Sequence, residues 1–212
     1  MEIAFLGCGQ VGAPLANRLQ RLGHRVIIAA RNPESDSVRN LLALNNQIEA
    51  MPPTEAVSLA DVVFLATPFQ ANEEALAGVK HALAGKVLID CTNPVGPGLT
   101  HGLNNVQSGS EWVQTLVPAA RVVKAFTIYG FENFDDPTFP GYAVKPAMLY
   151  CGNDAQAKRT AHQLIAELGW EPVDTGGLEQ ALHLEHMTLL WIRMVRINGH
   201  SPYLVWAKLT RD

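Results

Sequence analysis

The sequence has few charged residues, few cysteines and no long hydrophobic run, and each absence excludes a class of protein. Charged residues make up 17% of the 212 and the formal net charge is −4, so a concentrated basic surface for nucleic acid is not expected. No run of about 18 uncharged apolar residues occurs, which predicts that the chain has no membrane span. The cysteines are three, far apart and without metal-ligand spacing: Cys8, Cys91 and Cys151.

These features favour a folded protein of the cytoplasm. Met1 leads directly into strand-like sequence, without the pattern of a signal peptide. We therefore expect the cysteines to be small buried hydrophobes in a reducing compartment, and we expect no metal site. Hydrophobic residues make up 48% of the chain, which is enough to bury a sizeable core.

Short apolar runs alternate with longer helix-like segments, which is typical of parallel βαβ units. Strands are predicted over residues 3–6, 25–29, 47–51, 61–66, 86–90, 121–126, 147–151 and 171–174. Helices are predicted over residues 11–22, 34–44, 154–168 and 178–197, and an irregular loop over 131–145. The pattern predicts an α/β fold with a Rossmann-type, doubly wound, mostly parallel sheet over residues 1–177. A short helical extension, 178–212, would pack on it or on a second subunit.

A glycine motif follows the first predicted strand and opens the first predicted helix. Residues 7–12 read G-C-G-Q-V-G, which matches G-x-G-x-x-G. In a dinucleotide site, Gly7 would allow the tight turn, Gly9 would let a pyrophosphate approach the backbone, and Gly12 would let the helix pack closely on the strand. The motif alone also fits an ordinary strand-to-helix turn, but its place in a βαβ unit favours dinucleotide binding.

The end of the second predicted strand favours NADP over NAD. NAD sites place an acidic residue there, about 20 residues beyond the glycines, to bind the ribose 2′-hydroxyl. Residues 28–33 read I-A-A-R-N-P, with no acid at the tip. The Arg31 guanidinium can pair with a 2′-phosphate and Asn32 can donate a hydrogen bond. Alternatively, Arg31 is a solvated loop residue with Glu34 as its partner.

Short polar turns end the next two strands, where ligands of open α/β sheets bind. Thr67 and Asn93 are candidates for polar contacts to ribose and nicotinamide, although both residue types are common in turns. No nucleophile–base pair stands out, so the catalytic residues stay unassigned. Lys124 ends a buried strand and could point into the cleft or be structural.

With these residues in place, the chain resembles the NADPH-dependent reductases of the deazaflavin coenzyme, and also the cytoplasmic reductase domain of six-transmembrane ferric reductases. The segments that carry the resemblance are residues 7–12, 30–33, 61–67, 121–126, 151–158 and 174–178. The lysine–alanine–phenylalanine run at 124–126 and the cysteine–glycine–asparagine–aspartate run at 151–154 are more specific than the glycine motif.

The resemblance implies a position for each part of NADP. It puts the pyrophosphate at residues 9–12, the 2′-phosphate at Arg31 and Asn32, the nicotinamide ribose near Thr67 and the ring near 93–94 and 125. The expected cofactor-binding residues are Gly7, Gly9, Gln10, Val11, Gly12, Arg31, Asn32, Thr67, Pro68, Asn93, Pro94 and Ala125.

The predicted activity is hydride transfer between NADP(H) and a flavin-like or deazaflavin ring, which needs proximity more than an acid or base. Tyr129, Phe131 and Trp191 are candidate walls for the second ring. Residues 127–131 depart from the substrate-contacting segment of the deazaflavin reductases. Alternatives are an NADPH-dependent reductase of a small imine or ketone and a non-catalytic NADP-binding redox sensor.

The last predicted helix is apolar around most of its circumference in its second half, residues 187–197. A helix that lies on its own sheet needs only one apolar stripe. We therefore expect a second cover, either the same helix of another copy in a homodimer or the tail from His200 folded back over it.

Overall fold

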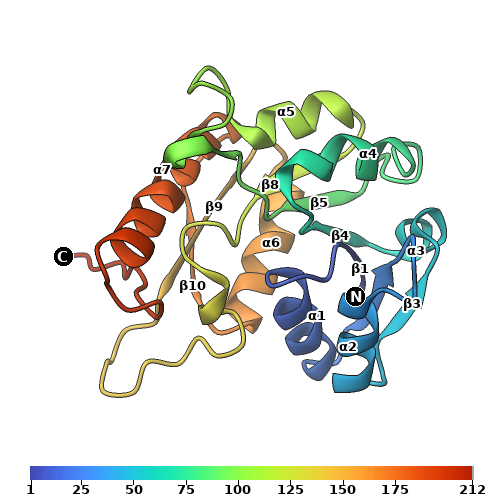
Figure 1. Ribbon diagram of the computed structural model, residues 1–212, viewed down its shortest axis with the longest axis horizontal. Coiled ribbons are helices and arrows are strands. Elements are labelled where there is room, and N and C mark those ends of the chain that lie inside the picture. Colours follow the sequence, from blue (N-terminus) through green and yellow to red (C-terminus); the bar gives the residue numbers. More distant parts are fainter. Residues whose placement is uncertain (212) are drawn as a thin grey trace.

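The computed structural model describes residues 1–211, which form one eight-stranded sheet (Figure 1). The strands are β1 (Glu2–Leu6), β2 (Arg25–Ala29), β3 (Glu49–Met51), β4 (Val62–Leu65), β5 (Val87–Asp90), β8 (Arg121–Lys124), β9 (Ala147–Gly152) and β10 (Glu171–Asp174). Their order is β10-β9-β8-β5-β4-β1-β2-β3. Neighbours are parallel except β8 and β9, which pair antiparallel. The predicted Rossmann-type, mostly parallel sheet is confirmed.

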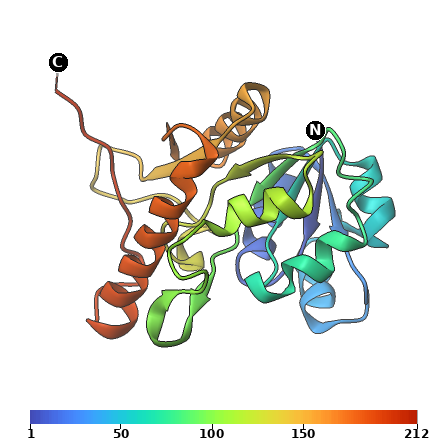
Figure 2. The same ribbon diagram turned by 90° about the horizontal axis from the view of Figure 1, so that it is seen from above.

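Helices cover both faces of this sheet (Figures 1 and 2). The core on one face includes residues of α1 (Gly12–Arg21), α2 (Asp36–Leu44) and α6 (Ala155–Glu167). The core on the other face includes residues of α3 (Pro53–Leu59), α4 (Asn72–Ala77) and α5 (Gly109–Leu116). Ile3 and Phe5 of β1 belong to the first core, and Ala4 and Leu6 to the second. Burial on both faces explains why the strands are continuously hydrophobic.

All eight predicted strands and all four predicted helical segments are present, and several further features were not predicted. Helices α3, α4 and α5 are short, and the 3₁₀ turn η1 (Phe69–Ala71) precedes α4. Strands β6 (Val95–Gly96) and β7 (Thr100–His101) form a small separate hairpin around the 3₁₀ turn η2 (Pro97–Leu99). The direction of β9 was not predicted either. A parallel neighbour needs a crossover connection, usually a helix, whereas residues 125–146 form a loop whose regular structure is the 3₁₀ turn η3 (Phe131–Asn133).

The C-terminal helical segment is continuous over residues 178–197, as predicted. It consists of the 3₁₀ turn η4 (Leu178–Gln180), α7 (Ala181–Ile192) and the π-helical turn η5 (Arg193–Ile197). Helix α7 packs against α5 and β9 of the same chain (Figure 2). The predicted boundary at Gly177 falls in the turn before η4, and Asp212, the last residue of the predicted extension, lies outside the described residues.

The tail after η5 folds back over α7, as in one of the two alternatives above. Trp191 Nε1 donates to the Leu204 carbonyl at 2.7 Å, and Trp206 Nε1 donates to the Ile128 carbonyl at 3.2 Å. Two apolar side chains of the helical segment stay uncovered, because Leu190 and Ile197 are 51% and 67% exposed. Within residues 1–211, none of the helices combines the length and the apolar character needed to cross a membrane.

Candidate functional site

The glycine loop between β1 and α1 contains two glycines that packing requires and a third, Gly9, that lies beside open space. Gly7 has φ +97°, and a Cβ there would lie 2.7 Å from the Ala66 carbonyl oxygen. A Cβ at Gly12 would overlap the Gly7 carbonyl oxygen, so this glycine is also required by packing. At Gly9, by contrast, no heavy atom of residues 1–211 other than those of Gly9 and its two chain neighbours lies within 4 Å of a Cβ position. The loop therefore presents an open backbone face in front of the first turn of α1.

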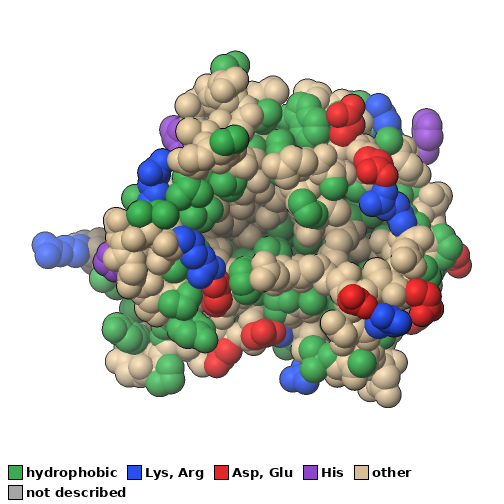
Figure 3. Space-filling model, viewed as in Figure 1, with side chains coloured by type: hydrophobic (Ala, Val, Ile, Leu, Met, Phe, Trp, Pro, Cys, Tyr) green, Lys and Arg blue, Asp and Glu red, His purple; other side chains and the backbone are tan. Residues whose placement is uncertain are grey.

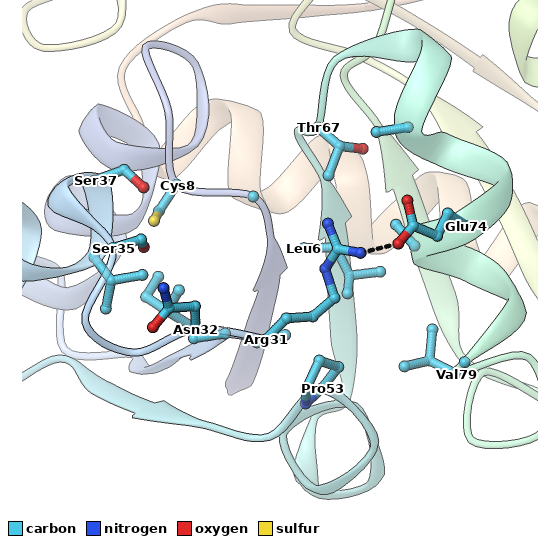
Figure 4. Close-up of a pocket in the computed structure, with 18 residues that line it drawn as sticks. Leu6, Cys8, Arg31, Asn32, Ser35, Ser37, Pro53, Thr67, Glu74 and Val79 are labelled. Atoms are coloured by element: carbon cyan, nitrogen blue, oxygen red, sulfur yellow. Dashed lines mark hydrogen bonds and ion pairs between the residues drawn. The ribbon is translucent and has the colours of Figure 1, made fainter.

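A cavity of about 310 Å³ opens beside this loop, and we call it the β2-tip cavity. Its walls come from the ends of β1 and β2, the first turns of α2 and helix α4 (Figure 4). Arg31 forms an ion pair with Glu74 of α4 across this cavity. The structure pairs Arg31 with Glu74 rather than with Glu34, the alternative partner considered from the sequence.

Sequence reasoning missed several residues of the β2-tip cavity. Ser35 and Ser37 line it on the side of Asn32 and Cys8, opposite Glu74 (Figure 4). Serine and asparagine after a β2 tip provide hydrogen-bond donors, so the run after Arg31 carried a signal. Glu74 gave no such signal, because it lies 43 residues from Arg31 in the sequence.

Thr67, at the end of β4, lines the β2-tip cavity and begins a chain of buried hydrogen bonds. Its hydroxyl donates to Asn72 Oδ1 at 2.7 Å, and Asn72 Nδ2 donates to Thr92 Oγ1 at 2.9 Å. The Thr92 hydroxyl donates to Asp90 Oδ1 at 2.7 Å. These bonds fix the turns after β4 and β5 relative to each other.

The chain of hydrogen bonds ends in a buried ionic cluster. Lys124 Nζ lies 3.4 Å from Asp90 Oδ2 and 2.9 Å from Glu185 Oε1, and all three side chains are at most 1% exposed. Burial lowers the pKa of Lys124, but the two carboxylates more than offset burial, so its pKa lies above the ordinary lysine value. Lys124 is therefore a charged structural residue rather than a cleft residue.

Glu185 anchors α7 through this cluster. Its carboxylate accepts from the Gly109 N–H at 3.0 Å, at the start of α5, and lies 2.8 Å from His101 Nε2 of β7. One side chain thus joins α7 to β8, α5 and the small hairpin. Removal of any partner would leave buried charge unpaired, so the position of α7 is strongly constrained.

A second cavity of about 280 Å³, the α7 cavity, lies between the glycine loop, the ends of β5 and β8, and α7. It is lined by Val11, Cys91, Asn93, Phe126, Thr127, Tyr129, Gly130, Phe131, Phe134, Thr188, Trp191, Ile192 and Arg196. The lining is mostly apolar, and it contains the three aromatic residues predicted as walls for a ring. Figure 3 shows the face of Figure 1 hollowed near its centre, with charged side chains mainly at the margins.

The polar groups of the α7 cavity are few. Thr188 Oγ1 lies 3.1 Å from Asn93 Oδ1 and donates to the Thr127 carbonyl at 2.7 Å. The Thr127 hydroxyl is buried and has no hydrogen-bond partner within residues 1–211. Burial raises the pKa of Tyr129 well above its ordinary value, so its phenol is neutral.

Backbone geometry shapes this cavity at two positions. Phe126 has φ +57°, which is rare for a bulky residue, and its ring packs in the core 5.8 Å from the ring of Trp170. The chain turns there, after β8, and Thr127 then lines the cavity. A Cβ at Gly130 would overlap the Trp191 ring, so only glycine lets this indole pack as it does.

An arginine–glutamate pair also lies at the edge of the α7 cavity. Arg196 pairs with Glu132, and its guanidinium carbon lies 5.3 Å from the centre of the Trp191 ring. Both cavities thus have one such pair, at positions far apart in the sequence.

The predicted site residues divide between the cavities. Gly7, Arg31, Asn32 and Thr67 line the β2-tip cavity. Val11 and Asn93 line the α7 cavity. The remaining predicted residues lie in the glycine loop or the strand-end turns outside both linings, namely Gly9, Gln10, Gly12, Pro68, Pro94 and Ala125. The Ala125 side chain is fully buried.

Comparison with known proteins shows which class of protein and which family this chain belongs to. Residues 2–94 match the family described as NADP oxidoreductase, coenzyme F420-dependent. An F420-dependent NADP reductase of Methanothermobacter marburgensis is 31% identical over 211 residues, which covers 92% of each chain. A crystal structure of a putative F420-dependent NADP reductase from Arthrobacter sp. FB24 is 30% identical, with a TM-score of 0.85, and the match covers 94% of this chain and 95% of that one. The chain therefore belongs to the coenzyme F420-dependent NADP oxidoreductase family, and the predicted family and NADP-dependent oxidoreductase class are confirmed.

The second predicted resemblance is confirmed as well. Metalloreductase STEAP3 of Rattus norvegicus is 30% identical over 188 residues, which cover 89% of this chain. The chain spans only 36% of the length of that relative. Within residues 1–211, no group of three or more His, Cys, Asp or Glu side chains is arranged to hold a metal ion.

Proposed function

We propose that the protein transfers hydride between NADP(H), bound along the glycine loop, and a flat flavin-like or deazaflavin ring in the α7 cavity. The observation that carries the proposal is the position of the α7 cavity. Val11 of the glycine loop and Asn93 after β5 both line it, so it adjoins the strand ends where a nicotinamide would lie. Two rings held face to face in such a site need orientation rather than an acid–base pair.

The cofactor half of the proposal follows from the loop and the β2 tip. The open face at Gly9 and the first turn of α1 would hold the pyrophosphate, since backbone N–H groups there favour anions. Arg31 and Asn32, with Ser35 and Ser37, would hold the 2′-phosphate. Thr67 would then lie near the nicotinamide ribose.

The acceptor half follows from the α7 cavity. Trp191, Tyr129 and Phe131 provide apolar and aromatic surface for a planar ring. The unpartnered Thr127 hydroxyl would bond a heteroatom of that ring, and Arg196 would meet an anionic substituent. A ring bound against this mostly apolar lining would exclude water from the site of hydride transfer.

The test is a panel of acceptors in anaerobic NADPH oxidation. Coenzyme F420, FMN and riboflavin are compared with a ferric chelate, a small cyclic imine and a small ketone. We expect turnover with at least one ring acceptor and none with the imine or ketone. Turnover confined to the imine or ketone would support the reductase alternative, and NADPH binding with no turnover on any acceptor would support the redox sensor.

A variant links the turnover to the α7 cavity. Trp191→Leu should raise the KM for the ring acceptor by about tenfold or more, because a buried aromatic contact contributes roughly 1–2 kcal/mol. The NADPH dissociation constant should stay within a factor of about two, because Trp191 is not one of the predicted cofactor-binding residues. His183→Ala, an exposed change on the same helix, is the matched control. An unchanged acceptor KM in Trp191→Leu would place the acceptor elsewhere.

We also propose that the protein is a homodimer joined through the exposed apolar side chains of α7 and η5. Leu190 and Ile197 stay exposed although the tail covers their neighbours. A second copy is the simplest cover for this strip. Light scattering at micromolar concentration tests it, because a mass of 23.0 kDa would be that of the monomer.

The proposed compartment is the cytoplasm. Cys8, Cys91 and Cys151 are all free and buried, which fits a reducing environment. Localisation of a tagged full-length chain in its host cell tests this, and secretion would contradict it.

A further inference from the structure

The β2-tip cavity has one wall that suits a phosphate and one that does not. Asn32, Ser35 and Ser37 line the first wall, which carries uncharged donors. The facing wall is α4, and Glu74 in its first turn presents a carboxylate to the cavity. A 2′-phosphate bound against the first wall would thus face an anion across the cavity.

Arg31 is the cation between these walls, and it is turned toward the acidic one. Figure 4 shows its guanidinium reaching across the cavity to Glu74, away from Asn32, Ser35 and Ser37. Both side chains are largely exposed, 66% for Arg31 and 72% for Glu74. An exposed pair of this kind is weak, so a phosphate dianion can displace the carboxylate from it.

We infer that Glu74 is a specificity-determining residue, which competes with the 2′-phosphate of NADP for the Arg31 guanidinium and so moderates the preference for NADP over NAD. This rests on the cofactor half of the proposed function. In the free protein Glu74 holds Arg31 across the cavity. On NADP binding the guanidinium turns to the phosphate and Glu74 is left in solvent, whereas NAD leaves the Arg31–Glu74 pair closed.

Competition predicts a gain of affinity when the competitor is neutralised. In Glu74→Gln the dissociation constant of NADPH should fall by about two- to fivefold, the range that an exposed ion pair supports. The constant for NADH should change by less than about twofold, because NADH carries no group that needs Arg31. The NADPH gain should shrink as salt rises, since both the pair and the repulsion are exposed.

Glu73→Gln is the matched control for this variant. Glu73 is the preceding residue in the same turn of α4, is exposed, and lies outside the cavity lining. Like Glu74→Gln, the Glu73→Gln substitution removes one negative charge from the first turn of α4, so a general electrostatic effect of the helix would appear in both variants. An equal gain in Glu73→Gln would overturn the inference.

The experiment is a fluorescence titration of NADPH and NADH against the full chain, its Glu73→Gln, Glu74→Gln and Arg31→Met variants, and the Arg31→Met/Glu74→Gln double variant. We expect the Glu74→Gln gain to shrink when Arg31 is methionine, because only the direct repulsion between Glu74 and the phosphate is then left to remove. A gain that persists undiminished without Arg31, or weaker binding of either cofactor in Glu74→Gln, would overturn the inference. Arg31→Met separates this result from the proposed function, because equal weakening of NADPH and NADH there would refute the 2′-phosphate site itself.

Discussion

The β2-tip cavity and the α7 cavity are built in different ways. The lining of the first comes from residues 6–79, within the segment that matches the family profile. The lining of the second comes from residues 11–196 and exists only when the end of the chain is packed against the sheet. The first has a mixed, hydrogen-bonding lining, and the second is mainly aromatic and aliphatic. A local motif thus defines the proposed cofactor side, whereas tertiary packing defines the proposed acceptor side.

The difference shows where specificity can change in this fold. A substitution at the β2 tip alters one loop and its facing helix. A substitution in the α7 cavity alters contacts among segments that are far apart in the sequence, and one of them, α7, is anchored by the buried cluster of Lys124, Asp90 and Glu185. Cofactor choice should therefore respond to single residues, and acceptor binding should respond to the position of α7.

The largest effect is expected at Lys124, which joins the two regions. Lys124→Met leaves two buried carboxylates unpaired and should destabilise the fold by about 3–5 kcal/mol. Urea denaturation measures the loss. The control is Lys158→Met, since Lys158 pairs with Asp174 near the surface and should cost less than about 1 kcal/mol. Equal effects of the two substitutions would contradict the role of the buried cluster.

The same variant has a defined pH dependence. Because the pKa of Lys124 is raised in the folded protein, the stability from its charge is fully present below the ordinary lysine pKa of about 10.4 and is lost as pH rises through the folded value. The stability difference between wild type and Lys124→Met should thus stay constant between about pH 6 and pH 9 and shrink at higher pH.

The next largest effects are expected in the glycine loop, where one substitution should weaken cofactor binding and another should lower stability. Gly9→Val places a branched side chain on the open face and should weaken NADPH and NADH alike by about a hundredfold, the loss of two charge-assisted hydrogen bonds. Its melting temperature should change little. Gly12→Ala should do the reverse and lower the melting temperature, because its Cβ overlaps backbone. A folded Gly9→Val protein with normal NADPH affinity would show that the pyrophosphate does not bind at this loop.

A smaller, selective effect is expected at the β2 tip. Arg31→Glu should weaken NADPH by tenfold or more, since a charge-assisted pair contributes about 1.5–3 kcal/mol, and should affect NADH far less. Fluorescence titration with both cofactors measures the ratio. The acceptor KM at saturating NADPH should not move, which would sharpen the contrast between the two cavities. Parallel loss of both cofactors would mean that Arg31 does not recognise the 2′-phosphate.

The smallest effect is expected in the α7 cavity. Thr127→Val keeps the shape of the side chain but removes a hydroxyl without a partner in residues 1–211. If the acceptor ring uses this hydroxyl, its KM should rise by about two- to tenfold, since one hydrogen bond contributes roughly 0.5–1.5 kcal/mol. Steady-state kinetics with the ring acceptor measure it. A higher melting temperature with an unchanged KM would show that the hydroxyl contacts no acceptor.

Much of the fold could be predicted because the strands are buried on both faces. Strands β2 and β10 have the predicted bounds, and the others differ by at most two residues at either end. Helices α3 to α5 were not predicted, because segments of six to eight residues show too little of the helical hydrophobic periodicity. One signal was available, since Ser108 and Glu111 form a capping box at the start of α5.

The site could be predicted only where its parts are close in sequence. The glycine loop and Arg31 belong to one βαβ unit, so their chemistry is visible in short motifs. The Arg31–Glu74 and Lys124–Glu185 pairs could not be predicted, because the partners are 43 and 61 residues apart in the sequence. Phe131 and Trp191 were predicted as aromatic walls, but their place beside Val11 follows from how α7 packs rather than from any spacing.

The Glu185 anchor also orders events during synthesis. Chains leave the ribosome N-terminus first, so β1, β2 and α4 emerge long before Glu185 does. Until then Lys124 and Asp90 lack their third partner, and the α7 wall of the α7 cavity does not exist. If the α7 cavity is the acceptor site, a nascent chain should consequently bind the dinucleotide before it can bind the second ring. Arrested nascent chains of increasing length, probed with fluorescent NADPH, should show cofactor binding at lengths that still lack turnover.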